Sequence, residues 1–132
     1  MGILIDTSVL IDAERGRLDL APHLAARTGE QVFLSAVSVS ELLYGAYRDT
    51  GTRNKRLAVA EAVLTQFKVL QIDTPATRLH PRIKADLAAR GTPVGPHDLW
   101  LAASAMAHGL TMATANLRDF QRIPGLQVEA WT

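Results

Sequence analysis

The chain has 132 residues, with 14 lysine and arginine residues against 13 aspartate and glutamate residues, and it has no cysteine. This length fits one domain with its own hydrophobic core, so we expect residues 1–132 to form a single domain. The lack of cysteine excludes disulfides, zinc–thiolate sites and thiol nucleophiles, so a bound metal ion would need oxygen or imidazole ligands. The net charge of +1 requires any nucleic-acid partner to bind locally clustered basic residues. No apolar segment is long enough to cross a membrane and Asp6 interrupts the first ten residues, so we expect a cytoplasmic protein without membrane association.

Short apolar segments alternate with longer segments of helical period. This pattern indicates an α/β domain with a mostly parallel sheet. We expect strands at Gly2–Ile5, Gln31–Leu34, Val69–Ile72, Leu110–Thr114 and Gln127–Ala130. We expect helices from Asp6–Ser8 through Val9–Ile11, at Ser38–Tyr47, Leu57–Phe67, Ala76–Arg90 and Gly95–Ala107, and a short turn or helix at Asn116–Phe120.

Three acidic residues hold equivalent positions in these elements. Asp6, Glu41 and Asp98 each lie in the first turn of an expected helix. Asp6 and Asn116 also follow expected strands directly, and parallel α/β sheets bind their ligands outside the carboxyl ends of the strands. The sequence therefore predicts that remote segments converge on one pocket.

Each acid also has a purely structural explanation. Asp6 can cap a helix, Asp98 can favour the positive end of a helix dipole, and Ser38–Glu41 fits a capping box. Capping alone does not account for the small residues that follow two of the acids by one turn, at Gly45 and Ala102. We expect these small residues to keep the helix faces beside the acids open.

Converging carboxylates repel one another unless a cation lies between them. Oxygen ligands without cysteine or an HxxxH pair favour Mg²⁺ or Mn²⁺ over Zn²⁺. The positive helix N-termini would help to keep the acids ionised at neutral pH. A bound Mg²⁺ activates water and stabilises charge on a phosphate, so phosphodiester hydrolysis is the expected chemistry.

Four segments carry a resemblance to a known family that covers nearly the full length of the chain. They are Ile3–Ile11, Ser38–Leu42, Asp98–Ala105 and Thr114–Phe120. In this order and spacing, they make the chain resemble a PIN-domain ribonuclease, and specifically the VapC-type toxins of bacterial toxin–antitoxin pairs. The resemblance implies a three-layer α/β/α domain with a central, mostly parallel sheet, and a Mg²⁺-dependent endoribonuclease.

The resemblance also implies roles for individual residues. Asp6, Glu41 and Asp98 would form the acidic, metal-binding cluster, with Asp6 and Asp98 as the direct Mg²⁺ ligands. Many relatives have an acid in the segment where this chain has Asn116, and Asp119 lies three residues further on. Either Asn116, through its carbonyl oxygen, or Asp119, through its charge, would complete the catalytic set.

Four neighbouring polar residues have two interpretations each. Thr7, Ser8 and Thr114 either hydrogen-bond the acids and metal waters or serve as helix caps and strand-end hydroxyls. His97 adjoins Asp98 and is a weaker candidate for a proton carrier, because successive side chains of a helix point apart.

A basic cluster follows the helix that carries Glu41, at Arg48, Arg53, Lys55 and Arg56. This cluster either binds the phosphates of RNA or forms a solvated turn. The resemblance further implies a VapB-type antitoxin that covers the cleft, contact with DNA only through that antitoxin, and a homodimer. Apolar residues around Leu42, Leu57 and Leu64 supply either the dimer surface or the core.

Two other functions compete with a toxin ribonuclease. One is a housekeeping RNA-processing nuclease of the same fold. The other is a non-catalytic partner that pairs with an antitoxin in a DNA-binding autorepressor, which the amide of Asn116 in place of an acid favours. The sequence does not identify which RNA would be cut.

Overall fold

The structure, a computed structural model, describes residues 2–132. The strands are β1 (Gly2–Ile5), β2 (Gln31–Ser35), β3 (Lys68–Leu70), β4 (Thr111–Thr114) and β5 (Val128–Ala130). They form one sheet in the order β3-β2-β1-β4-β5, and every pairing is parallel. The helices are α1 (Thr7–Glu14), α2 (Ala21–Ala25), α3 (Ala36–Arg48), α4 (Arg53–Leu64), α5 (Thr74–Ala89), α6 (Pro96–Ala107) and α7 (Leu117–Gln121).

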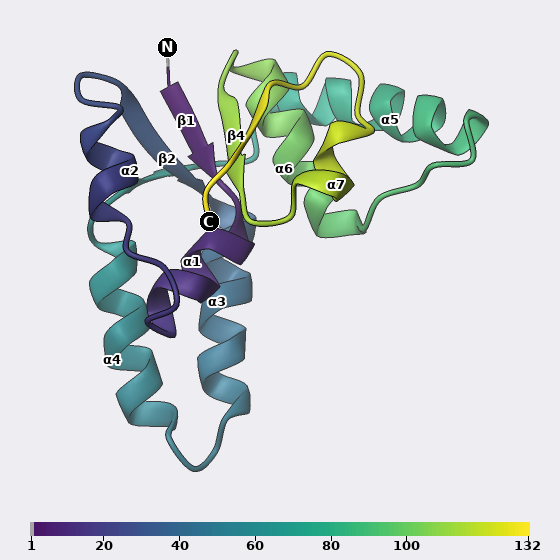
Figure 1. The fold of residues 1–132 in the computed structure, drawn as a ribbon. Coiled ribbons are helices and arrows are strands. Elements are labelled where there is room, and N and C mark those ends of the chain that lie inside the picture. Colours follow the sequence, from purple (N-terminus) through teal and green to yellow (C-terminus); the bar gives the residue numbers. More distant parts are fainter. Residues whose placement is uncertain (1) are drawn as a thin grey trace.

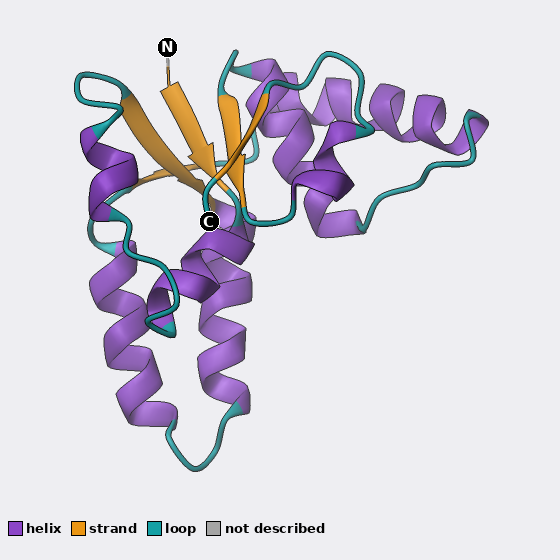
Figure 2. Ribbon diagram, viewed as in Figure 1, coloured by secondary structure: helices purple, strands orange, loops and turns teal. Residues whose placement is uncertain are grey.

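Helices cover both faces of the sheet, so the three-layer α/β/α architecture is confirmed (Figures 1 and 2). Strand β1 shows why two cores form: successive side chains of a strand point to opposite faces, and all of β1 is buried. Leu4 belongs to the core beneath α5 and α6. Ile3 and Ile5 belong to the other core, with side chains from α1, α3 and α4.

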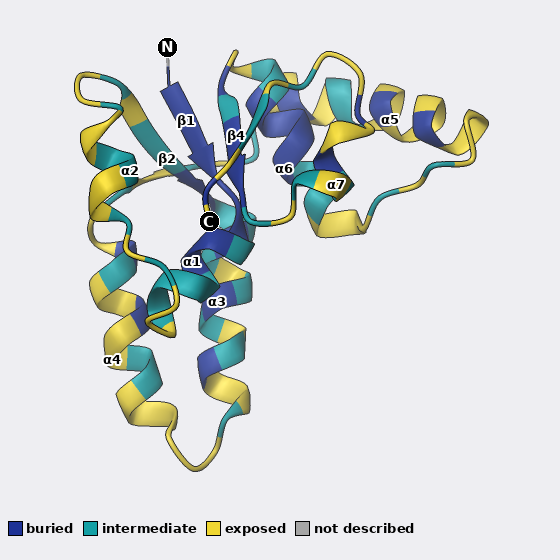
Figure 3. Ribbon diagram, viewed as in Figure 1, coloured by how far each residue is buried: buried dark blue, intermediate teal, exposed yellow. Residues whose placement is uncertain are grey.

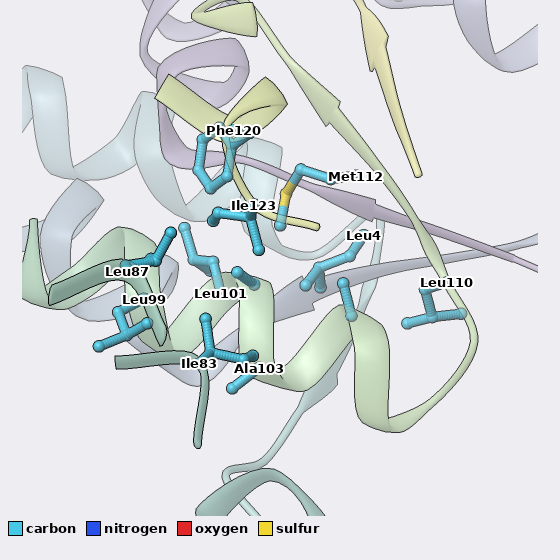
Figure 4. Packing of buried hydrophobic residues seen from close by; sticks show 12 residues of the cluster. Leu4, Ile83, Leu87, Leu99, Leu101, Ala103, Leu110, Met112, Phe120 and Ile123 are labelled. Carbon is cyan, nitrogen blue, oxygen red and sulfur yellow. The ribbon is translucent and has the colours of Figure 1, made fainter. Parts of the chain in front are cut away.

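The core beneath α5 and α6 draws its side chains from both strands and helices (Figure 4). Ile83 and Leu87 come from α5, Leu99 and Leu101 from α6, and Phe120 from α7. Each large aliphatic side chain buried in such a core contributes roughly 1.5–3 kcal/mol to folding. This packing fixes α6, which carries Asp98, against the sheet.

Helices α3 and α4 form an antiparallel hairpin that extends away from the carboxyl edge of the sheet (Figures 1 and 3). Leu42 and Leu64 pack into the core, whereas Leu57 is half-buried. Tyr44 and Tyr47 on α3 are exposed, at 64% and 55%. The outer part of the hairpin is therefore solvated, and the apolar positions divide between core and surface.

Most predicted elements occur, with shifts at their ends. Helix α6 matches its prediction because Gly95 precedes Pro96 at the first helical position. Helix α3 begins earlier than predicted, because the Ser35 side chain accepts a hydrogen bond from the Val37 amide and caps the helix there. Helix α2 was not predicted, because it has only five residues and no buried side chain.

In the part of the chain that the structure describes, no helix has the length and apolar character needed to cross a membrane.

Candidate active site

The candidate site lies at the carboxyl edge of the sheet, between β1 and β4. The chain order runs outward from β1 through β2 to β3 and then returns to β4 on the other side of β1. This reversal is the position at which open parallel sheets bind ligands. Asp6 follows β1 and Asn116 follows β4, so the predicted placement of both residues is confirmed.

Asp6 is buried and held by two hydroxyl groups. It is 3% exposed, and its Oδ2 accepts hydrogen bonds from Ser8 Oγ at 2.6 Å and Thr114 Oγ1 at 2.8 Å. Burial raises the pKa of Asp6, the hydrogen bonds from Ser8 and Thr114 oppose that rise, and the charge of Glu41 adds to it. Ser8 and Thr114 therefore hold the carboxylate as the resemblance implied, and the side chain of Asp6 caps no helix.

Glu41 lies beside Asp6 but on a different part of its helix than predicted. It occupies the second turn of α3, because the helix begins at Ala36, so the prediction of a first-turn position and of a Ser38–Glu41 capping box was wrong. Thr7 Oγ1 donates a hydrogen bond to Glu41 Oε1 at 2.7 Å. His97 Nδ1 lies 2.9 Å from Glu41 Oε2. The Glu41 carboxylate is thus held by side chains from α1 and α6.

Asp98 shows that the acids of four segments share one electrostatic environment. It lies in the first turn of α6, as predicted. Burial, followed by the charges of Asp6, Asp119 and Glu41, raises the pKa of Asp98 to about 6. In residues 2–132, neither Asp6 nor Asp98 forms a salt bridge with lysine or arginine. The cluster therefore carries negative charge that a cation would relieve.

Asn116 and Asp119 act as a connected pair. Asn116 Nδ2 donates a hydrogen bond to Asp119 Oδ2 at 2.6 Å, and the backbone N–H of Asn116 donates to Thr114 Oγ1 at 2.9 Å. Arg122 Nη2 lies 3.7 Å from Asp119 Oδ1. Asn116 thus orients Asp119, whose charge reaches Asp98.

The small residues one turn beyond the acids have different surroundings. Gly45 lines a cavity of about 450 Å³ that also borders Glu41 and His97, so this face of α3 is open as predicted. Ala102 is fully buried in the core beneath α5 and α6, so the prediction that it keeps a face open was wrong. Its small side chain lets α6 pack closely against the sheet.

The basic cluster divides between structural contacts and the cavity. Arg56 lies 3.1 Å from Glu14 Oε1 and donates to the Gly45 carbonyl at 3.1 Å, which fixes α4 to α1 and α3. Arg53 donates to the Tyr47 carbonyl at 3.0 Å. Arg48 and Arg56 both line the same cavity as Glu41.

Sequence reasoning did not assign Tyr44 or Arg15 to this cavity. Tyr44 follows Glu41 by three positions on α3, a spacing that places both on one helix face and would have revealed it. Arg15 comes at the end of α1, where its position depends on tertiary packing.

The donor set suits a hard, oxygen-preferring cation. In residues 2–132, no three acidic or histidine side chains are arranged as a ready-made metal site. Mg²⁺ tolerates this because it usually keeps several waters and takes only one or two carboxylates from a protein. Asp6, Asp98 and Glu41 fit such an ion by charge and chemistry.

Comparisons with known proteins agree with this geometry. The family model described as PIN domain matches residues 3–126. The chain is 42% identical to the tRNA(fMet)-specific endonuclease VapC of Salmonella typhimurium, covering 97% of this chain and 96% of that protein. It is 37% identical to ribonuclease VapC1 of Rickettsia felis, covering 97% and 95% of the two chains.

Solved structures give the same result. A chain in the crystal structure of DNA-bound VapBC from Salmonella typhimurium superposes with a TM-score of 0.91 at 34% identity, covering 100% of this chain and 99% of that one. A chain of the toxin–antitoxin complex VapBC-5 from Mycobacterium tuberculosis superposes with a TM-score of 0.74 at 33% identity, covering 98% and 95%. The fold, the acids at the carboxyl edge of the sheet and these relatives together show that the chain belongs to the PIN-domain family, among the VapC ribonucleases.

Proposed function

We propose that this chain is a Mg²⁺-dependent endoribonuclease that acts as the toxin of a toxin–antitoxin pair. The observation that supports this most strongly is the charge coupling at Asp98. Burial, followed by the charges of carboxylates from three other segments, raises its pKa to about 6, and in residues 2–132 no lysine or arginine forms a salt bridge with it. Such a site gains most by binding a cation next to an anionic phosphodiester.

Asp6 and Asp98 would bind the ion directly, and Glu41 would bind it either through a carboxylate oxygen or through a water molecule. Mg²⁺, or Mn²⁺ in its place, would supply an activated water and a positive charge beside the phosphate. Ser8 and Thr114 keep the Asp6 carboxylate oriented, which reduces the rearrangement needed for binding. Asp119, oriented by Asn116, adds the fourth carboxylate charge.

Glu41 is the best placed residue to orient an attacking water. Thr7 binds its Oε1 and His97 lies against its Oε2, so the carboxylate cannot rotate freely. A carboxylate held in this way can accept a hydrogen bond from water in line with the phosphorus atom. His97 is 59% exposed and lies against Glu41, so its first role in this proposal is to position that carboxylate.

Initiator tRNA is the RNA substrate that we propose to assay first. The Salmonella typhimurium relative is a tRNA(fMet)-specific endonuclease, and its identity to this chain extends over nearly the whole of both proteins. Aromatic residues make up 5% of the chain, which favours recognition of RNA shape over stacking on many bases.

A VapB-type antitoxin and a second copy of the chain are the protein partners that we propose. Structures of the Salmonella typhimurium and Mycobacterium tuberculosis relatives are VapBC complexes. Exposed Tyr47 and Val59 on the α3–α4 hairpin offer apolar surface for a protein partner. DNA would be contacted through the antitoxin. Light scattering of the purified chain, alone and with the antitoxin, tests both assemblies.

Cleavage of initiator tRNA and of total RNA tests the enzymatic part of the proposal. The wild-type chain should cut in Mg²⁺ or Mn²⁺ and stop when EDTA is added. Asp6→Asn and Asp98→Asn should each lose at least about a hundredfold in rate. Asp86→Asn, which changes an exposed acid on α5, is the matched control and should cut normally. Unchanged cleavage by folded Asp98→Asn would contradict the proposed site.

Two further measurements separate the alternatives. Growth arrest on expression, relieved by a small antitoxin, supports a toxin over a housekeeping nuclease. Calorimetry with Mg²⁺ separates the enzyme from a non-catalytic partner, because a site that binds no divalent ion at millimolar concentration cannot perform this chemistry.

A further inference from the structure

The cavity beside Glu41 has chemistry that the acidic cluster does not use. Its volume is about 450 Å³, within the range of pockets that hold small ligands. Glu41 and His97 form its border with the acidic cluster, and Tyr44, Gly45 and Arg48 line it along α3. A ligand in this cavity would therefore lie next to the phosphodiester at the acidic cluster.

Tyr44 and Arg48 form an exposed aromatic and cationic platform in this cavity. The Tyr44 side chain is 64% exposed, and the Arg48 guanidinium lies 5.7 Å from the centre of its ring. The residues are four positions apart on α3, so they share a helix face with Glu41. An exposed aromatic ring beside an arginine is the arrangement on which unpaired bases stack.

The charges around the cavity also favour a nucleotide. Arg56 and Glu14 pair with each other, with Nε and Oε1 3.1 Å apart, so these two charges are already balanced. In residues 2–132, Arg15 and Arg48 form no salt bridge, and both are exposed. Arg15 and Arg48 therefore place two unbalanced positive charges beside the acidic cluster. These charges suit the phosphate of an RNA strand that extends from the acidic cluster into the cavity.

Gly45 leaves room for a base beside Tyr44 and Arg48. It is a helical residue without a side chain, a choice that costs a helix about 1 kcal/mol relative to alanine. A Cβ atom there would meet only Arg56 Nη2, at 3.8 Å, so packing does not require glycine. The missing side chain keeps the cavity open instead.

We propose that this cavity binds one unpaired nucleotide of the RNA substrate, adjacent to the phosphodiester that is cut. Its base stacks on Tyr44 beside Arg48, and its phosphate is held by Arg15 and Arg48. This inference rests on the proposed function, because it assigns the neighbouring nucleotide of the same substrate. It also names the substrate class as RNA with an unpaired base next to the cleavage position.

Titration with mononucleotides tests the cavity without requiring cleavage. Nuclear magnetic resonance spectra are recorded with each nucleoside 5′-monophosphate and, separately, with inorganic phosphate, at millimolar concentrations. Nucleotides should shift the Tyr44 ring protons upfield and perturb the Gly45 and Arg48 amides, whereas phosphate should perturb the Arg15 and Arg48 signals alone. If no nucleotide shifts the Tyr44 ring, the inference is overturned.

Cleavage kinetics provide the second test, with a conservative variant of Tyr44 and a variant outside the cavity as controls. Loss of one stacked base is worth about 1–3 kcal/mol, so Tyr44→Ala should raise KM roughly 5- to 150-fold, while Tyr44→Phe retains the wild-type KM. Arg48→Ala should weaken RNA binding and make it less sensitive to salt. Asp86→Asn changes an exposed acid on α5 outside the cavity and should leave KM unchanged.

The outcomes separate this inference from the proposed function. Normal cleavage and KM in Tyr44→Ala and Arg48→Ala would overturn the nucleotide site, while the proposed nuclease activity would stand. Nucleotide binding at Tyr44 without any cleavage of RNA by the wild-type chain would instead support the site and overturn the proposed activity.

Discussion

His97 Nδ1 lies 2.9 Å from Glu41 Oε2, which joins the first turn of α6 to the second turn of α3 at the border of the acidic cluster. The neighbouring residue Asp98 faces the cluster, so one turn of α6 supplies both an acid and the contact that positions a second acid. The two halves of the site are therefore coupled through α6.

We expect His97→Ala to lower the rate of RNA cleavage by less than about tenfold, because Thr7 still holds Glu41. A residue that transfers the proton itself would contribute more than that. His97→Gln, which can still donate to Glu41, should recover much of the rate if positioning is its main role. Single-turnover cleavage measures both variants. A loss as large as that of Asp98→Asn would show that His97 is itself essential for proton transfer.

Asp98→Asn should stabilise the metal-free protein while it abolishes cleavage. Because the pKa of Asp98 is raised to about 6 in the folded chain, the folded state binds its proton more tightly than the unfolded state, in which the carboxyl has its ordinary pKa of 3.8. The free energy of unfolding therefore falls as pH rises through this window and levels off above it.

At pH 7.5 in EDTA, we expect Asp98→Asn to gain roughly 1–2 kcal/mol, a value reduced for solvent screening at this half-buried group. At pH 4, where Asp98 is protonated in the folded state and about half ionised in the unfolded state, most of the gain should be lost. Urea denaturation at both pH values measures it, and the exposed Asp86→Asn is the control. A gain that is equal at both pH values would contradict the charge coupling.

Thr114→Val should weaken both folding and metal binding. The substitution keeps the shape of a fully buried side chain but removes the hydroxyl that donates to Asp6 Oδ2 at 2.8 Å. The pKa of Asp6 should rise further, and the free energy of unfolding should fall by about 1–3 kcal/mol. Mg²⁺ affinity should fall about tenfold, as measured by calorimetry.

Thr111→Val on the same strand is the matched control, because the Thr111 hydroxyl donates to Gln127 Oε1 at 3.3 Å in an exposed contact at the start of β4. Thr111→Val should change the free energy of unfolding and the Mg²⁺ affinity only slightly. An equal loss of Mg²⁺ affinity in the two variants would show that Thr114 acts only through the stability of β4.

Asp119→Asn should reduce cleavage more than Asn116→Ala does. The charge of Asp119 contributes to the raised pKa of Asp98, whereas Asn116 only orients Asp119 through a 2.6 Å hydrogen bond. We expect a loss of roughly tenfold or more for Asp119→Asn and less for Asn116→Ala, by analogy with groups that orient metal ligands. Initial rates at saturating Mg²⁺ measure the order, and a reversed order would identify Asn116 as the residue that completes the site.

The sequence by itself determined the features that depend on neighbouring residues along the chain. Apolar runs predicted β1 and β2, and proline with an alanine-rich segment predicted α6 within one residue. The position of Asp6 after one strand and Asn116 after another placed the site at the carboxyl edge, because all parallel strands end there.

Only the tertiary structure decided how the acids are held and which faces stay open. Packing against the sheet buried Ala102 and left Gly45 in a cavity, whereas the shift of Glu41 into the second turn of α3 follows from a local cap at Ser35 that the sequence prediction missed. The contact of His97 with Glu41 joins residues of two helices that no local pattern relates. Periodicity reports which residues share a helix face, but only the packing of helices on both sides of the sheet fixes what each face meets.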